Sequence, residues 1–216
     1  MPRPAEGARI DERAVRQILD RYACPVPYHE VRARFLGSIA TPVIGASPVV
    51  VVQNLWGGEL PEFESLEAAN ELIGILVNGL WNGLTRHQKR TEPFRVIRLV
   101  VPATREGIAQ LALTRRQEVD GFVEGLFAGQ GEIDLPDKSN EALNVLGEIR
   151  AMMDGVHVLA TDESKPAPSA ELEKTLKYVQ QLSRTIEQEM NAVLLDCTRA
   201  RRAAMRETGP PGVTRH

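Results

Sequence analysis

The stretch EVDGFVEGLFAGQGEID, residues 118–134, is unusually rich in glycine. Glycines gather in loops that bind phosphate, or on helix faces that touch another helix. Phosphate loops need the spacing G-x-G-x-x-G or G-x-x-x-x-G-K-[ST], but Gly121, Gly125 and Gly129 stand four residues apart and acidic residues follow them. Residues four apart share one helix face, where small side chains let two backbones approach. We therefore predict a helix-packing face of Gly121, Phe122, Gly125 and Gly129.

Composition places the chain among ordinary globular proteins. Its 216 residues are 43% hydrophobic and 25% charged, which suits one domain with a substantial core. A net charge of −3 and an aromatic content of 5% argue against nucleic acid as a partner. Cys24 and Cys197 are far apart in the sequence and are predicted to be reduced thiols. No apolar run is long enough for a membrane span and the first residues are polar, so we expect a cytoplasmic protein without membrane association.

Apolar residues recur at helical spacing through most of the chain. The pattern predicts helices over 10–22, 30–40, 65–90, 104–129 and 135–155, the last ending at Gly155. Ser65 and Thr104 are suitable N-caps for two of them. The buried face of the 65–90 helix is predicted to consist of Leu66, Ala69, Ile73, Leu76, Leu80 and Leu84.

Two stretches have the composition of β-strands. The four valines 49–52 follow Ser47 and Pro48, an N-cap with proline in the first helical position, and precede Gly57, so a short helix is favoured. The stretch FRVIRLVVP, 94–102, has no partner strand and is predicted to be extended or a helical turn. With no alternation of strands and helices, the fold class is all-α.

The chain divides into a multihelical domain (1–160), a charged, proline-containing linker (161–168), a long C-terminal helix (169–205) and a flexible tail (206–216). Ser169 is predicted to cap the long helix. Its apolar face includes Leu176, Val179 and Ile186, which must pack either on the preceding domain or on a second subunit. These three residues are candidate partner contacts, and we expect a homodimer.

Residues 31–156 contain motifs that resemble the YecA/YgfB-like family of uncharacterised bacterial proteins. These motifs are Phe35–Leu36, a proline-containing loop (42–48), PEFES with Leu66–Glu67–Ala68, the run from Leu76 through Asn78 to Leu84, and Asp120–Gly121–Phe122 with Gly125. The resemblance implies a compact multihelical fold, a bacterial origin and cytoplasmic residence, and it supplies no reaction. The family's tryptophan before GF is absent here, and so is the Cys-rich tail of some members, so zinc is not carried over.

No catalytic, metal-binding or cofactor-binding residue stands out. Asp120 and Glu124 are four residues apart, as metal ligands on a helix would be, but Arg115 and Arg116 are close by and solvated charge explains them better. The histidines form neither H-x-x-x-H nor H-E-x-x-H. We predict no cofactor.

The two tryptophans, Trp56 and Trp81, are candidate anchors for a partner, although core packing accounts for them as well. The leading hypothesis is a non-enzymatic module that binds another protein by helix-in-groove docking. The alternative is a metal-dependent hydrolase of unknown substrate, which needs at least three converging ligands. A nucleic-acid adaptor is the third hypothesis, and only the basic segment 199–206 supports it.

Overall fold

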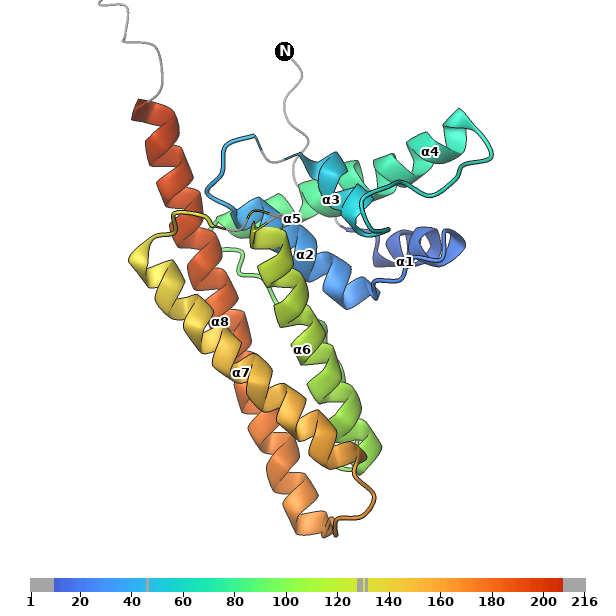
Figure 1. Ribbon diagram of the computed structural model, residues 1–216, viewed down its shortest axis with the longest axis vertical. Helices are drawn as coiled ribbons and strands as arrows, with labels where there is room; N and C mark the ends of the chain where they lie inside the picture. The colour runs from blue at the N-terminus through green and yellow to red at the C-terminus, as the bar shows by residue number, and fades with distance from the viewer. Residues whose placement is uncertain (1–9, 46, 128–129, 131, 208–216) are drawn as a thin grey trace, which may run out of the picture.

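The computed structural model describes residues 10–45, 47–127, 130 and 132–207, and within this part of the chain it contains helices and loops but no strand. The predicted all-α class is confirmed. A stalk of three long helices carries a head of short ones (Figure 1). The stalk consists of α6 (Arg105–Phe127), α7 (Asp137–Thr161) and α8 (Ser169–Glu207). The head contains α1 (Glu12–Arg21), α3 (Pro48–Asn54), α4 (Leu66–Ile73), the π-helical segment η1 (Gly74–Trp81), α5 (Asn82–Leu84) and the 3-10 turn η2 (Thr85–Gln88).

Helix α2 (Tyr28–Ala40) joins the head to the stalk by crossing α6. The crossing depends on glycine from both helices. A methyl group on Gly121 would lie 2.6 Å from the carbonyl oxygen of Glu30, and one on Gly125 or Gly37 would collide with the facing backbone. The predicted packing role of Gly121 and Gly125 is thus confirmed, with Phe122 fully buried between the helices. Gly129 lies outside the described residues.

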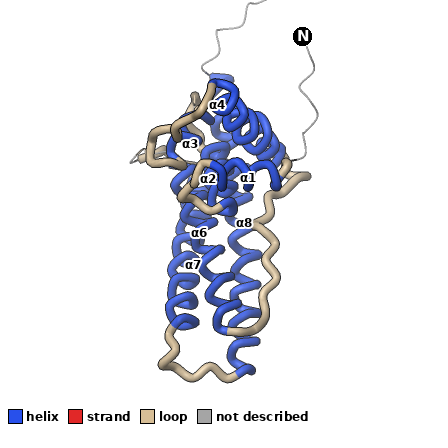
Figure 2. The backbone as a smooth tube through the Cα atoms, turned by 90° about the vertical axis from the view of Figure 1, so that its right-hand side faces the viewer, coloured by secondary structure: helices blue, strands red, loops and turns tan. Residues whose placement is uncertain are grey.

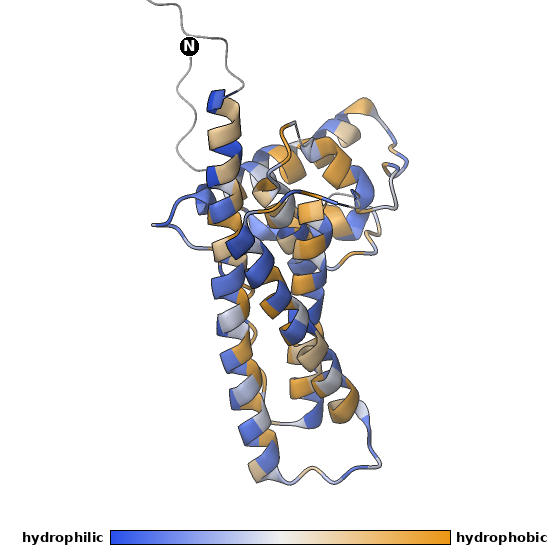
Figure 3. Cartoon of the chain, turned by 60° about the vertical axis from the view of Figure 1, so that its left-hand side comes forward, coloured by the Kyte–Doolittle hydropathy of each residue, from blue (hydrophilic) through white to orange (hydrophobic). Residues whose placement is uncertain are grey.

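The long helix α8 packs within its own chain. Its buried side chains recur along one side, facing α6 and α7, and hydrophobic residues reappear every turn or two along its ribbon (Figure 3). They belong to the same hydrophobic core as α2 and α6. This core forms because the apolar stripe of each stalk helix is removed from water by the other two. The buried residues of α8 are Val179, Ser183, Ile186, Met190, Val193, Leu194, Cys197 and Thr198.

The segment 94–101 is extended and runs beside α8 (Figure 2). Side chains of the stalk replace the missing partner strand. Phe94 donates its N–H to Asn191 Oδ1 at 2.8 Å and accepts a bond from Asn191 Nδ2 at 3.0 Å, and the N–H of Val96 donates to Glu187 Oε1 at 3.2 Å. These bonds satisfy backbone groups that a helix or sheet would otherwise have to pair.

A buried ion pair of α6 continues the same arrangement on the other edge of the segment. The N–H of Ile97 donates to Glu118 Oε1 at 2.8 Å, and its carbonyl oxygen accepts from Arg115 Nη2 at 2.8 Å. Arg115 also forms an ion pair with Glu118 and donates from Nε to Ser183 Oγ at 3.0 Å. No sequence motif marks this ion pair, which is buried because the backbone of the extended segment needs a donor and an acceptor there.

The predicted 65–90 helix is present but changes its winding. Ser65 caps it by accepting from the N–H of Ala68 at 3.2 Å, as predicted. The buried row is Leu72, Leu76, Leu80 and Leu84, and Leu66 is 72% exposed, so its predicted burial was wrong. Residues four apart drift by about 40° per step around an α-helix. The wider turns of η1 offset this drift and hold the row against the core.

The predicted ends of the helices agree with the structure in some places and differ in others. Helix α7 was expected to end at Gly155, but it continues to Thr161, because Gly155 keeps helical geometry in open space. The short valine helix was predicted correctly: Pro48 is its first residue and Gly57 follows it with φ of 82°. Ser169 was predicted to cap the long helix from outside, which was wrong by one residue, since it is the first residue of α8 itself. No helix in the described part of the chain is both long and apolar enough to cross a bilayer.

Candidate functional site

A groove of about 700 Å³ lies between α6 and α7 and reaches α2. Four apolar side chains, Val119, Val123, Phe127 and Leu143, line it. The polar side chains that line it are Glu30, Arg116, Gln117, Asp120, Glu124, Asn140, Asn144 and Arg150. We call this surface the α6–α7 groove.

The groove continues toward the head. A neighbouring hollow of about 480 Å³ shares Glu124 and Phe127 with it and extends to Arg34, Val51 and Asn54. Gly147 of α7 also lines the groove, and a methyl group there would meet no atom within 4 Å. The missing side chain of Gly147 therefore leaves room in the groove, whereas the glycines of α6 serve close packing.

Ion pairs hold the charged walls in place. Arg150 Nε lies 2.6 Å from Asp120 Oδ1, Arg116 pairs with Asp154, and Arg116 Nε is 4.0 Å from Asp120 Oδ2. Since these groups are partly exposed, each pair contributes little to stability. The pairs instead fix the positions of the charged groups, so that arginine and carboxylate groups alternate along α6 and α7.

Helix α2 contributes Glu30 to the wall, and its neighbour His29 bonds Gln117, which lines the groove. Glu30 pairs with Arg34 at 3.0 Å, and burial raises the pKa of Glu30 while Arg34 opposes the rise. His29 Nε2 lies 2.9 Å from Gln117 Oε1, and burial lowers the pKa of His29. At neutral pH the His29 ring is therefore uncharged, and Nε2 carries the proton that the amide oxygen accepts.

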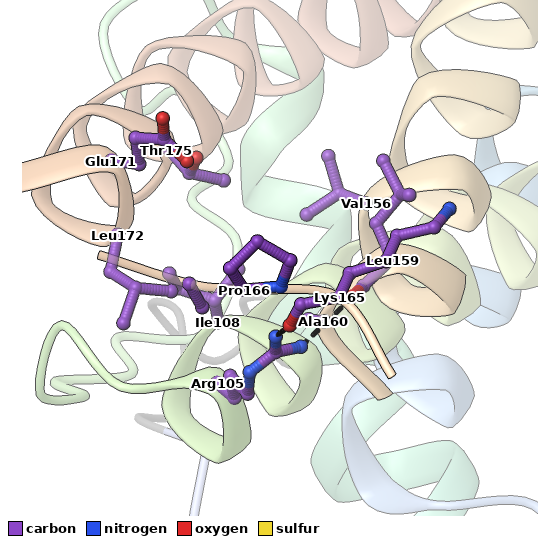
Figure 4. Close-up of a pocket in the computed structure, with 11 residues that line it drawn as sticks. Arg105, Ile108, Val156, Leu159, Ala160, Lys165, Pro166, Glu171, Leu172 and Thr175 are labelled. Atoms are coloured by element: carbon purple, nitrogen blue, oxygen red, sulfur yellow. Dashed lines mark hydrogen bonds between the residues drawn. The ribbon is translucent and has the colours of Figure 1, made fainter. Parts of the chain in front are cut away.

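Another hollow, of about 240 Å³, lies at the end of the stalk that is remote from the head, where α6 and α8 begin and α7 ends (Figure 1). Figure 4 shows the residues that line it. We call it the tip cavity. Ile108 comes from the first turns of α6, Leu159 from the end of α7 and Leu172 from the start of α8. Pro166 of the loop 162–168, the predicted linker, forms part of its wall, and Arg105 holds this loop through bonds to its carbonyl groups.

The two tryptophans lie in the head, away from the α6–α7 groove. Trp56 is partly buried and donates from Nε1 to the carbonyl oxygen of Tyr22 at 2.9 Å. Trp81 packs edge-on against Phe35, with ring centroids 5.7 Å apart, and lines a separate hollow of about 230 Å³ together with Met205. Trp81 thus combines core packing with partial access to solvent.

The three candidate partner residues of α8 do not form an exposed surface. Val179 and Ile186 are fully buried within the chain, and Leu176 is partly buried against the same core. Among the candidates of the basic segment, Arg199 pairs with Asp196 at 2.6 Å, and Arg201 Nη1 donates to the carbonyl oxygens of Ile39 and Thr41.

Sequence reasoning missed the groove residues Val123, Leu143 and Gly147. Asp120 and Glu124 were noticed, but as an isolated pair on α6. The sequence does contain a partial signal for α6, the apolar row Val119, Val123 and Phe127. This row lies beside the glycine face at which α6 crosses α2. Its partner on α7 has no local sequence signal, since it depends on how two helices pair.

Within the described ranges, no group of three or more histidine, cysteine, aspartate or glutamate side chains is arranged to hold a metal ion. The carboxylates nearest to such a group, those of the α6–α7 groove, face arginines instead.

Comparison with known proteins adds no relative: no protein-family model matches the chain, and no curated protein or solved structure does either. The resemblance to the YecA/YgfB-like family therefore stays a prediction from the sequence.

Proposed function

We propose that the protein is a non-enzymatic binding module that receives an amphipathic helix of another protein in the α6–α7 groove. The observation that carries this proposal is the combination of an apolar floor with charged walls that are already fixed by ion pairs. Val123, Phe127 and Leu143 are partly exposed apolar side chains in a concave surface, and helix-in-groove recognition uses apolar anchors of this kind.

The dimensions of the groove suit one face of a helix. A helix presents apolar residues at i, i+3 or i+4 and i+7, and its backbone needs a channel rather than a closed pocket. The main hollow of about 700 Å³ and its continuation of about 480 Å³ form such a channel along α6. Polar walls that alternate in sign favour a partner helix with both acidic and basic residues beside its apolar row.

The hydrolase alternative gains no support from the same surface. Asp120 pairs with Arg150 and Arg116, and Glu124 pairs with Arg34. Carboxylates engaged by guanidinium groups in this way are typical of a fixed recognition surface.

The proposal is tested by photo-crosslinking in cells that naturally produce the protein. The photoreactive residue p-benzoylphenylalanine replaces Asn144 in the groove, and in a control sample it replaces Val158, which is 58% exposed on the same helix. We expect a discrete crosslinked protein from position 144 only. Identification of the product by mass spectrometry also tests the predicted homodimer, since a product made of two copies of this chain would replace the partner protein by a second subunit.

A matched pair of glycine variants tests whether the groove itself is occupied. Gly147→Gln inserts a side chain into the groove, and Gly155→Gln inserts the same side chain into open space elsewhere on α7. Neither added Cβ meets an atom within 4 Å, so both variants should fold. We expect Gly147→Gln to remove the crosslink and Gly155→Gln to leave it. Equal crosslinking in the two variants would contradict the proposal.

A further inference from the structure

The tip cavity has an apolar interior and one cationic group with unused hydrogen-bond donors. Its apolar lining consists of Ile108, Val156, Leu159, Ala160, Pro166, Ala167 and Leu172. Arg105, Lys165, Glu171 and Thr175 complete the lining, so polar groups are confined to a few positions. Figure 4 shows Ile108, Pro166 and Leu172 grouped together, with Arg105 beside them. An apolar hollow with a few placed polar groups is the usual form of a small-molecule site.

Arg105 is positioned by the loop that it anchors. Its Nη1 donates to the carbonyl oxygens of Leu159 at 3.3 Å and Asp162 at 2.9 Å, and its Nη2 donates to the carbonyl oxygen of Lys165. A guanidinium has five N–H donors. Three are used, and the remaining two, on Nε and Nη2, have no acceptor in the part of the chain that the structure describes.

In a guanidinium, Nε–H and the adjacent Nη2–H point in the same direction along one edge of the plane. This fork matches the two oxygens of a carboxylate. Within the described residues, Arg105 forms no ion pair with any carboxylate of the chain, although Glu171 also lines the cavity. Holding the guanidinium on three carbonyl groups fixes its orientation before a ligand arrives.

Two helix N-termini also lie at this end of the stalk. Helices α6 and α8 both begin there, so the positive ends of two helix dipoles converge on the cavity (Figure 1). The negative end of α7 is neutralised by Arg105 itself through the Leu159 and Asp162 carbonyl groups. Lys165 lies 3.6 Å from Asp162 and adds a paired charge rather than a free one.

From this geometry we propose that the tip cavity binds a small aliphatic monocarboxylate, whose carboxylate lies on the free edge of Arg105 and whose hydrocarbon chain lies among Ile108, Leu159 and Leu172. The volume of about 240 Å³ equals that of about eight water molecules at roughly 30 Å³ each. A hydrocarbon chain of a few carbon atoms fits such a volume.

The test is a titration of the isolated protein with sodium hexanoate, followed by NMR of isoleucine and leucine methyl groups. Saturable shifts are expected for the methyl groups of Ile108, Leu159 and Leu172. Hexanamide has the same chain without the charge. Its affinity should be at least about tenfold lower, since a charge-assisted bond is lost. Each methylene removed from the ligand should weaken binding about fourfold, from roughly 0.8 kcal/mol per buried methylene.

Three variants separate the two parts of the site. In the Arg105→Met protein, hexanoate and hexanamide should bind with equal affinity, because the group that distinguishes them is gone. Ala160→Leu adds three carbon atoms to the cavity lining and should weaken binding of both compounds. Glu171→Gln removes a negative charge from the rim and should strengthen hexanoate binding without affecting hexanamide. Val158→Leu is the control, because Val158 neighbours Leu159 but does not line the cavity.

Two outcomes would overturn the proposal. Equal affinity for hexanoate and hexanamide would show an apolar hollow without carboxylate recognition. Absence of methyl shifts at concentrations on the order of 10 mM would show no binding of the predicted class. The measurement needs no partner protein, and Gly147→Gln should leave it unchanged, so its result is independent of the α6–α7 groove.

Discussion

The start and the middle of α6 each carry an arginine, and the two are in opposite situations. Near the middle of the helix, Arg115 is 4% exposed and donates from all three of its nitrogens, to Ser183, Glu118 and Ile97. In the first turn, Arg105 binds three backbone carbonyl groups and retains two free donors beside a cavity. The guanidinium of Arg115 is thus part of the core, whereas that of Arg105 is held in position and keeps hydrogen-bond donors that no group of the described chain accepts.

The packing around these two parts of α6 also differs. Around the second half of α6 the packing is so close that Gly121 and Gly125 tolerate no methyl group, and at the first turn it leaves a hollow of about 240 Å³. Close packing of this kind is where a protein gains stability and a unique structure. The hollow beside Arg105 lacks this close packing and leaves room for a ligand.

The largest effect is expected from separating the buried ion pair. Glu118→Gln leaves the charge of Arg115 in the core without its carboxylate, which should reduce the free energy of unfolding by about 3–5 kcal/mol. Arg105→Met removes a partly exposed group and should cost about 1 kcal/mol or less. Urea denaturation followed by circular dichroism measures both. Similar losses in the free energy of unfolding for the two variants would contradict the view that only Arg115 is part of the stabilising core.

A second test addresses the packing contrast with one substitution at two glycines. Gly125→Ala forces α2 away from α6 at Arg34 and should cost about 2–3 kcal/mol or more. Gly155→Ala, in open helical space on α7, should stabilise the protein by about 0.5–1 kcal/mol, because alanine has the better helix propensity. Thermal unfolding of the two variants gives the comparison directly, and a stable Gly125→Ala protein would mean that the crossing is looser than described.

Sequence patterns predicted the elements of this fold better than their partners. Helical periodicity and caps located α1, α2, α3, α6 and most of α7 and α8, since these signals are local. The glycine spacing predicted that α6 meets another helix, but it did not identify Gly37 of α2 as the residue opposite. Which helix covers which face depends on the whole core.

The errors have specific physical causes. The buried ion pair of Glu118 and Arg115 was not predicted, because it depends on the extended backbone at Ile97, whose N–H and carbonyl groups these two side chains satisfy. The tip cavity was not predicted for a related reason. Its lining comes from the first turns of two helices and the end of a third, and none of these stretches has a motif of its own.

The smallest effect on stability is expected at the start of α6, next to the tip cavity. Thr104 Oγ1 accepts from the N–H of Gly107 at 3.1 Å, so Thr104→Ala should cost about 1 kcal/mol through the loss of this cap. Ser47 occupies the same position before α3 and its side chain makes no capping bond, so Ser47→Ala should change stability by only a few tenths of a kcal/mol. Urea denaturation resolves the difference. If Arg105 is held chiefly by the loop carbonyls, Thr104→Ala should lower stability while hexanoate binding is preserved, whereas a parallel loss of binding would show that the cap positions the guanidinium.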